Sequence, residues 1–159
     1  RHAVACVTAM SVAENMFLNK LDRFTRFGLL QRGALNTAAQ KQMKEFDVRA
    51  ANPEVAFSGL SGGNQQKAVL ARELTLDPLV ALVAAQPTRG LDIGATAFVW
   101  DALRKARDRG CGIILISSDL DELFDISDRV VVMLTGRVVG TFTAPYDMNA
   151  VGAAMIGVS

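Results

Sequence analysis

The sequence contains very few of the residues that build metal sites, disulfides and nucleophilic triads. Its 159 residues include a single histidine, His2, and only two cysteines, Cys6 and Cys111, which lie far apart and form no C-x-x-C pattern. One histidine leaves no material for a His-based metal site or a Ser/His/Asp triad, so we predict no metal site in this chain. The two cysteines are expected to be reduced packing residues of an intracellular protein.

Neither sign of charge dominates, and no long apolar run is present. The chain has 17 Lys and Arg residues against 16 Asp and Glu residues, which gives a formal net charge of +1. The lack of a basic stripe argues against nucleic acid as a partner, and the lack of an acidic tail argues against disorder. No apolar stretch reaches the ~18 residues that a membrane-spanning helix needs. Half of the residues are hydrophobic, so a chain of this length can bury the core of about one domain.

The most informative stretch is residues 60–67, Leu-Ser-Gly-Gly-Asn-Gln-Gln-Lys. Ser61 can cap a helix that begins at Gly62, because its hydroxyl can accept a hydrogen bond from a first-turn N–H. Gly62 and Gly63 have no Cβ, so another molecule can approach the backbone closely there. A helix N-terminus also offers N–H groups and a partial positive charge of about +0.5. The stretch is therefore suited to a phosphate group, and an ordinary capped helix is the alternative interpretation.

Capping and turn signals predict that the first half is mostly helical. A capping box of the form S-x-x-E at 11–14 predicts a short helix to about Leu18, and a second box at 37–40 predicts a helix to about Phe46. The other predictions for this half are a loop or short helix at 20–33, a linker with Pro53 at 48–58, and the glycine-led helix at 62–76.

The second half alternates between expected strands and helices. Residues 79–85 and 111–117 are apolar runs of strand length, typical of strands buried on both faces of a parallel sheet. Asp92 can cap a helix to about Arg109, and Ser118 can cap another to about Ile126. This order predicts an α/β fold with a parallel sheet. The last predictions are a hairpin of strands 129–133 and 137–142 that turns at Thr135-Gly136, and a closing helix at 146–156.

Side-chain environments are also predicted for the two helices of this half. Trp100 of the first helix is expected in the core. The residues expected near one face of that helix are Ile93, Ala97, Trp100 and Leu103. The acidic residues expected on a solvated face of the second helix are Asp121, Glu122 and Asp125.

The full string at 60–67 resembles the signature motif of the ATP-binding cassette (ABC) ATPases, and its Asn-Gln-Gln-Lys ending resembles the sugar and nucleoside importer branch. Arg1-His2 and residues 11–15 are similar to the segment after the Q-loop in importers with two fused cassettes. Residues 153–157 are similar to the end of the second cassette. The resemblance implies the second nucleotide-binding cassette of a tandem importer ATPase, truncated before its first residue.

The resemblance covers essentially the whole chain and implies an α/β fold, the C-terminal part of an ABC ATPase domain. The implied domains are a helical signature subdomain at 1–76 and a RecA-like α/β part at 77–159, with part of the parallel sheet but without the P-loop strand.

The positions that perform catalysis in the family are altered here. Ala85 and Gln86 stand where the family has the Asp that holds Mg²⁺ through water and the Glu that polarises the attacking water. Ser118 stands where members usually have the switch His, although the sugar-importer branch often has Ser. The G-x-x-x-x-G from Gly28 to Gly33 is not followed by Lys-Ser/Thr, so it is interpreted as a chance match and not a P-loop. No catalytic residue is predicted to be intact, and this chain alone is expected not to hydrolyse ATP.

The signature motif, by contrast, is intact. ABC cassettes pair head to tail, so the resemblance implies that the signature contacts ATP held, with its Mg²⁺, by a partner cassette. The implied ATP-contacting residues are Ser61, Gly62, Gly63, Asn64 and Gln65 of the signature and Asp92 of the D-loop.

The resemblance also implies a cellular setting. The partners would be another cassette fused upstream, transmembrane permease subunits and, indirectly, a solute-binding protein, on the cytoplasmic face of the cell membrane. The implied function is to couple ATP binding and hydrolysis to uptake of a sugar or nucleoside-like solute. One alternative is a non-catalytic binding module that only completes a partner's site. The other is a fragment of a chromosome-maintenance ATPase of the SMC kind, against which the near-neutral charge and the lack of long heptads argue.

Overall fold

The computed structural model describes residues 5–157, which divide into two compact units. The first unit comprises the residues up to 82 together with 87–113, and the second comprises 83–86 together with the residues from 114 onward. The resemblance at Arg1-His2 lies outside the described residues. The division into 1–76 and 77–159 stays a prediction.

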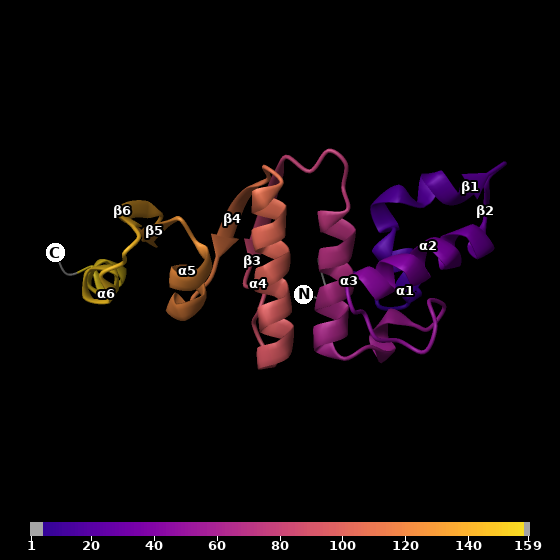
Figure 1. Ribbon diagram of the computed structural model, residues 1–159, viewed down its shortest axis with the longest axis horizontal. Coiled ribbons are helices and arrows are strands. Elements are labelled where there is room, and N and C mark those ends of the chain that lie inside the picture. Colours follow the sequence, from indigo (N-terminus) through magenta and orange to yellow (C-terminus); the bar gives the residue numbers. More distant parts are fainter. Residues whose placement is uncertain (1–4, 158–159) are drawn as a thin grey trace. The chain divides into compact units, whose positions relative to one another are not determined.

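The first unit is built mainly from helices, as the capping signals predicted. Helix α1 packs against both α2 and α3, and α3 lies beside α4 (Figure 1). The segment from Gly28 to Gly33, interpreted as a chance match, runs from the turn of the β1–β2 hairpin through β2 to the start of α2. The elements are helices α1 (Val12–Met16), α2 (Arg32–Glu45), α3 (Gly62–Leu74) and α4 (Ile93–Asp108), 3₁₀ segments η1 (Leu18–Phe24) and η2 (Phe57–Gly59), and short strands β1 (Thr25–Arg26) and β2 (Leu29–Leu30).

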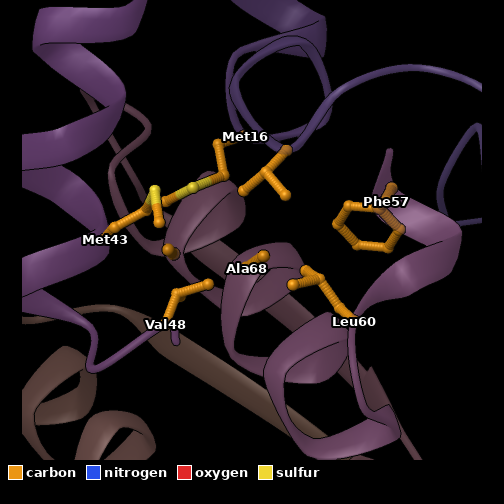
Figure 2. Packing of buried hydrophobic residues seen from close by; sticks show 8 residues of the cluster. Met16, Met43, Val48, Phe57, Leu60 and Ala68 are labelled. Atoms are coloured by element: carbon orange, nitrogen blue, oxygen red, sulfur yellow. The ribbon is translucent and has the colours of Figure 1, made fainter. Parts of the chain in front are cut away.

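The core of this unit lies among α1, α2 and α3 (Figure 2). Met16, Met43, Phe57 and Leu60 gather around Ala68 of α3, and Phe57 is fully buried. Burial of such a side chain contributes about 1.5–3 kcal/mol to stability. Because Leu60 belongs to this core, the backbone that leads into α3 is anchored on its apolar side.

The capping box at the start of α1 is confirmed. Ser11 Oγ accepts a hydrogen bond from the backbone N–H of Glu14 (3.1 Å), and the Glu14 carboxylate accepts one from the backbone N–H of Ser11 (2.8 Å). These hydrogen bonds hold the pKa of the Glu14 carboxyl below its usual value.

The start predicted for α2 at Thr37 is wrong. The helix begins at Arg32, and Thr37 lies inside it, where its hydroxyl donates to the carbonyl of Gly33 (2.9 Å). Such back-bonding is the alternative to capping for a threonine within a helix. The earlier turn is stabilised by packing, because Leu35 is buried with Ala39 and α1 in a second apolar cluster.

Two longer strands pair with each other, and the boundary between the units runs through both. They are β3 (Ala81–Ala85) and β4 (Gly112–Ile116). The N–H of Gly112 donates to the carbonyl of Val80 (2.9 Å), and the N–H of Gln86 donates to the carbonyl of Ile116 (2.7 Å). Both bonds join the strands in the same chain direction, so the pair is parallel, as predicted.

The prediction that these strands are buried on both faces is wrong within residues 5–157. The side chains of Val80, Val83, Ile114 and Ile116 are 71%, 63%, 61% and 52% exposed. In the part of the chain that the structure describes, β3 and β4 form a sheet of two strands only. Apolar strands exposed in this way favour self-association.

The second unit contains a hairpin with helices packed on it. The predicted hairpin is confirmed: β5 and β6 are antiparallel, and Thr135 and Gly136 at its turn have φ angles of 47° and 77°. Two positive φ angles match the twist of a tight hairpin turn. Val130 and Val132 of β5 are buried with Val151 of α6. The elements are α5 (Leu120–Ile126), β5 (Arg129–Leu134), β6 (Arg137–Thr143) and α6 (Met148–Ile156).

Helix α5 is capped by Asp119 and not by Ser118 as predicted. Asp119 Oδ1 accepts hydrogen bonds from the N–H groups of Asp121 (3.1 Å) and Glu122 (3.3 Å). A carboxylate at this end also interacts favourably with the helix dipole. The solvated position predicted for Glu122 is wrong as well, because this side chain is fully buried.

Helix α4 buries only part of the predicted face. Leu103 is buried as predicted, but Ile93 is 90% exposed and Trp100 is only partly buried. Val99, which was not placed on that face, is fully buried. The face is set by packing against α3, since Ala95 in the first turn faces Gly63. Among residues 5–157, none of the helices has both the length and the hydropathy needed to cross a bilayer.

Candidate functional site

The N-terminus of α3 carries the predicted phosphate-binding turn. Ser61 is its N-cap: Oγ accepts from the backbone N–H of Asn64 (3.4 Å) and from Asn64 Nδ2 (3.0 Å). Ser61 and Gly62 are both exposed, so a ligand can reach the hydroxyl and the backbone of the first turn. The cap predicted at Ser61 is confirmed.

Gly63 has no structural reason within the first unit to be glycine. A Cβ built on it would lie 3.6 Å from the Cβ of Ala95, an ordinary contact distance. A small side chain would therefore fit. The bare backbone of Gly63 is compatible with the close approach of a phosphate group that the sequence predicts there.

Gln65 lies under the turn and not on its surface. Its side chain is buried, and Nε2 donates to the carbonyls of Leu60 (3.1 Å) and Phe57 (3.3 Å). These bonds satisfy two backbone acceptors beside the core. A direct contact with a ligand, implied for Gln65 by the resemblance, is not open to this side chain in the structure, and its amide supports the turn.

Helices α3 and α4 begin side by side (Figure 1). Asp92 caps α4, with Oδ1 accepting from the N–H of Ala95 (2.8 Å), and Ala95 faces Gly63 of α3. The alternative reading of Asp92 as a helix cap is thus confirmed. The positive ends of two helix dipoles lie together at one end of the first unit, which favours an anion there. Two of the predicted ATP-contacting residues, Ser61 and Asp92, share this end.

A loop after α2 is bound to α3 at two points. Asn64 Oδ1 accepts from the backbone N–H of Arg49 (2.8 Å), and Lys67 Nζ pairs with Asp47 Oδ2 (2.6 Å). Lys67 Nζ also lies 4.9 Å from the centre of the Phe98 ring, a cation–π distance. The hydrogen bond from Lys67 lowers the pKa of the Asp47 carboxyl. Sequence reasoning missed this loop, because nothing local marks partners that lie 15 and 20 positions apart.

The second unit brings together Ala85, Gln86 and Ser118, which the resemblance implies are altered catalytic positions. Gln86, at the end of β3, has a φ angle of 50°, which is uncommon for a residue with a side chain. Its Oε1 lies 3.5 Å from Ser118 Oγ, longer than an ordinary O–H···O hydrogen bond. Ala85 and Ser118 are exposed. Strained backbone of this kind is often found at functional sites.

This pair has limited chemistry. An amide and a hydroxyl can orient a water molecule by hydrogen bonds, but neither accepts a proton near neutral pH as a carboxylate or imidazole does. Ala85 has no oxygen to bind a metal-bound water. These side chains therefore offer hydrogen bonds but no general base.

Known proteins match most of this chain. It is 43% identical over 142 residues to the nucleoside import ATP-binding protein NupA of Lactococcus lactis subsp. cremoris, and 41% identical over 142 residues to the ribose import ATP-binding protein RbsA 2 of Rubrobacter xylanophilus. The matches cover 88% and 89% of this chain but 28% and 27% of those proteins. The chain thus spans less than a third of the length of these curated relatives. No family model matches it.

The fold is similar to that of a solved dimeric ATP-binding cassette in a post-hydrolysis state, bound to ADP and Pi. The TM-score is 0.70 at 21% identity, over 89% of this chain and 60% of that chain. The sequence matches and the fold agree with each other and with the signature turn at α3. The chain therefore belongs to the ABC ATPases, as a segment homologous to the ATP-binding proteins of nucleoside and sugar importers.

Proposed function

We propose that this chain is part of the ATP-binding component of an importer for a sugar or nucleoside-like solute, and that its signature turn completes an ATP site on a partner cassette. The observation that carries the proposal is the exposed Ser61–Gly62 turn beside the start of α4, where two helix N-termini favour an anion. The relatives named for nucleoside and ribose import support the solute class.

The nucleotide is ATP, contacted in trans. Ser61 would donate a hydrogen bond to a phosphate oxygen, and the backbone of Gly62 and Gly63 would approach it closely. Charge-assisted hydrogen bonds of this kind contribute roughly 1.5–3 kcal/mol each. Asp92 lies at the same end of the unit and would contribute to the cassette interface. The Mg²⁺ that accompanies ATP would be held by the partner's site.

The proposed ATPase is asymmetric. The site that contains Gln86 and Ser118 would be poor at binding nucleotide or at hydrolysing it. It has an amide and a hydroxyl at positions where proton transfer needs a base. The isolated chain is accordingly proposed to act as a binding module. The specific observation in favour of this second role is the exposed Ala85 beside the left-handed Gln86.

The remaining partners follow from the importer role. A second cassette, fused upstream, would supply the ATP that the signature contacts, and permease subunits would receive the conformational change. A solute-binding protein would act indirectly, and the proposed location is the cytoplasmic face of the membrane. The near-neutral charge of the chain argues against nucleic acid as a further partner.

The test is Ser61→Arg in the complete protein that contains this chain. The bulky cation would occupy the space of the phosphate, so transport ATPase should fall at least tenfold. Thr141→Arg, on an exposed strand position of the second unit, is the matched control and should leave turnover unchanged. Normal hydrolysis by Ser61→Arg would rule out the role of the turn in the partner's site.

A further inference from the structure

Asn64 is the residue through which the loop after α2 reaches the signature turn. We propose that Asn64 is a positioning residue: it orients the Ser61 hydroxyl so that the proton points outward, and the Asp47–Lys67 pair holds the loop that orients Asn64. The inference rests on the proposed function, because the outward proton would be the donor to a phosphate.

The orientation of the Asn64 amide is fixed by its two partners. Oδ1 lies 2.8 Å from the backbone nitrogen of Arg49, which can only donate, and Nδ2 lies 3.0 Å from Ser61 Oγ. A flipped amide would place its NH₂ group against the N–H of Arg49, so two donors would face each other. Asn64 therefore presents a donor to Ser61.

The donor from Asn64 determines how the Ser61 hydroxyl is oriented. Its oxygen accepts from Asn64 Nδ2 and also lies 3.4 Å from the backbone nitrogen of Asn64. A hydroxyl has one proton and two acceptor positions. With its acceptor side turned to Asn64, the exposed hydroxyl directs its proton away from α3 and acts as a donor.

The loop is held in place by Lys67. Nζ donates to Asp47 Oδ2 (2.6 Å) and to the backbone carbonyl of Asp47 (3.2 Å), and the lysine side chain is only 12% exposed. Asp47 has a φ angle of 47°, so its backbone is left-handed and its carbonyl does not continue the direction of the α2 carbonyls. Asn64 and Lys67 are three residues apart and lie on one face of α3. Together they bind the segment from Asp47 to Arg49 along that face.

Asn64 could instead have a purely structural role, as part of the cap of α3. The variant Asn64→Asp distinguishes this structural role from the proposed positioning of the Ser61 hydroxyl. Aspartate in the first turn of a helix is compatible with the fold, and its charge is favourable there. It keeps an acceptor for Arg49 but presents a second acceptor to Ser61. The Ser61 hydroxyl would then rotate to donate to the carboxylate, and its proton would be lost to a phosphate.

The experiment measures the affinity of the complete protein for AMP-PNP, with Ser61→Ala, Asn64→Asp and the double variant. Each single variant should weaken binding about tenfold, the loss expected for one charge-assisted hydrogen bond. In the Ser61→Ala background, Asn64→Asp should add no more than about twofold, because the two changes remove the same interaction. The thermal midpoint of Asn64→Asp should not fall.

The binding measurements test the phosphate contact of Ser61 and the positioning role of Asn64 separately. No effect of Ser61→Ala would overturn both the proposed function and the inference. An effect of Ser61→Ala together with an equal penalty from Asn64→Asp in both backgrounds would mean charge repulsion only, and would overturn the inference while the proposed function stands.

The loop is tested by hydrogen exchange on Lys67→Met. The variant should speed exchange of the Arg49 amide at least tenfold and weaken AMP-PNP binding two- to threefold. Lys105→Met is the control, because Lys105 pairs with Asp101 at 2.7 Å on α4, away from the loop in sequence, and it should change neither. Unchanged protection of the Arg49 amide in Lys67→Met would overturn the role of the Asp47–Lys67 pair.

Discussion

The turn before α3 and the turn after β3 both present polar side chains at the end of a regular element, but they are supported very differently. At the first, Ser61, Asn64 and Gln65 are tied to backbone groups and to one another at 2.8–3.4 Å. At the second, the backbone N–H of the left-handed Gln86 donates to the carbonyl of Ile116 (2.7 Å), but its side chain meets Ser118 Oγ at only 3.5 Å. The side chains of the signature turn are therefore held in a more defined geometry than the side chains of Gln86 and Ser118.

The largest expected effect comes from removing the apolar support of the first turn. Phe57→Ala should destabilise the first unit by about 3–5 kcal/mol, because it leaves a cavity under Leu60 and Ala68. The single tryptophan, Trp100, reports on this unit in a urea titration followed by fluorescence. Phe142→Ala in the second unit is the control and should move the Trp100 transition much less. Equal shifts would show that the units unfold together.

The second prediction tests whether Ala85 and Gln86 are degenerate catalytic positions. Ala85→Asp with Gln86→Glu in the complete protein should raise ATP turnover by about 10²-fold or more, since general-base catalysis contributes about 10²–10⁴-fold. Steady-state phosphate release measures this. The control adds Ala84→Ser to this pair of substitutions. Ala84 is a neighbouring residue without a predicted role, so the gain in turnover should be the same. A double variant that is no faster would contradict the assignment of these positions as degenerate.

The third prediction concerns the strained backbone. Gln86→Gly should leave the second unit as stable as before or up to about 1 kcal/mol more stable, because glycine adopts a φ angle of 50° without a Cβ conflict. Gln86→Ala, which keeps the conflict, should give no gain. Hydrogen exchange of β4 and α5 provides the measurement, and a clear loss of protection in Gln86→Gly would show that its side chain holds this turn together.

The smallest effect is a pH dependence at the loop beside the first turn. The folded-state pKa of Asp47 is lowered by Lys67, so the pair stabilises the fold above the usual carboxyl pKa of 3.8, and this contribution disappears as the pH falls through the lowered value. Asp47 is about half exposed, so solvent screening limits the contribution to less than about 0.5 kcal/mol. Asp47→Asn should flatten this part of the acid-stability curve, and an unchanged curve would show that the pair contributes nothing measurable.

Prediction from the sequence succeeded at three caps with local partners, missed the α5 cap by one residue, and failed where the outcome depends on distant partners. The caps at Ser11, Ser61 and Asp92 lie within three residues of the N–H groups they accept from, so their geometry follows from the chain itself. The start of α2 and the burial of Glu122 depend on packing partners that a local pattern does not contain.

The two strands of the parallel pair show the same limit. Their apolar composition predicted strands correctly, but burial on both faces requires neighbours, and β3 and β4 pair only with each other among residues 5–157. Composition reports what a strand can bury and not what covers it.

Residue identity and short spacing were enough to predict the family and the helix that begins after Ser61, and they also led to the interpretation of Ala85, Gln86 and Ser118 as altered catalytic positions. Packing of the folded chain turns Gln65 inward, places the starts of α3 and α4 side by side, and brings the Arg49 N–H to the Asn64 amide oxygen. The physical reason is that hydrogen-bond orientation and dipole alignment depend on groups brought together by packing, at separations that no local pattern encodes.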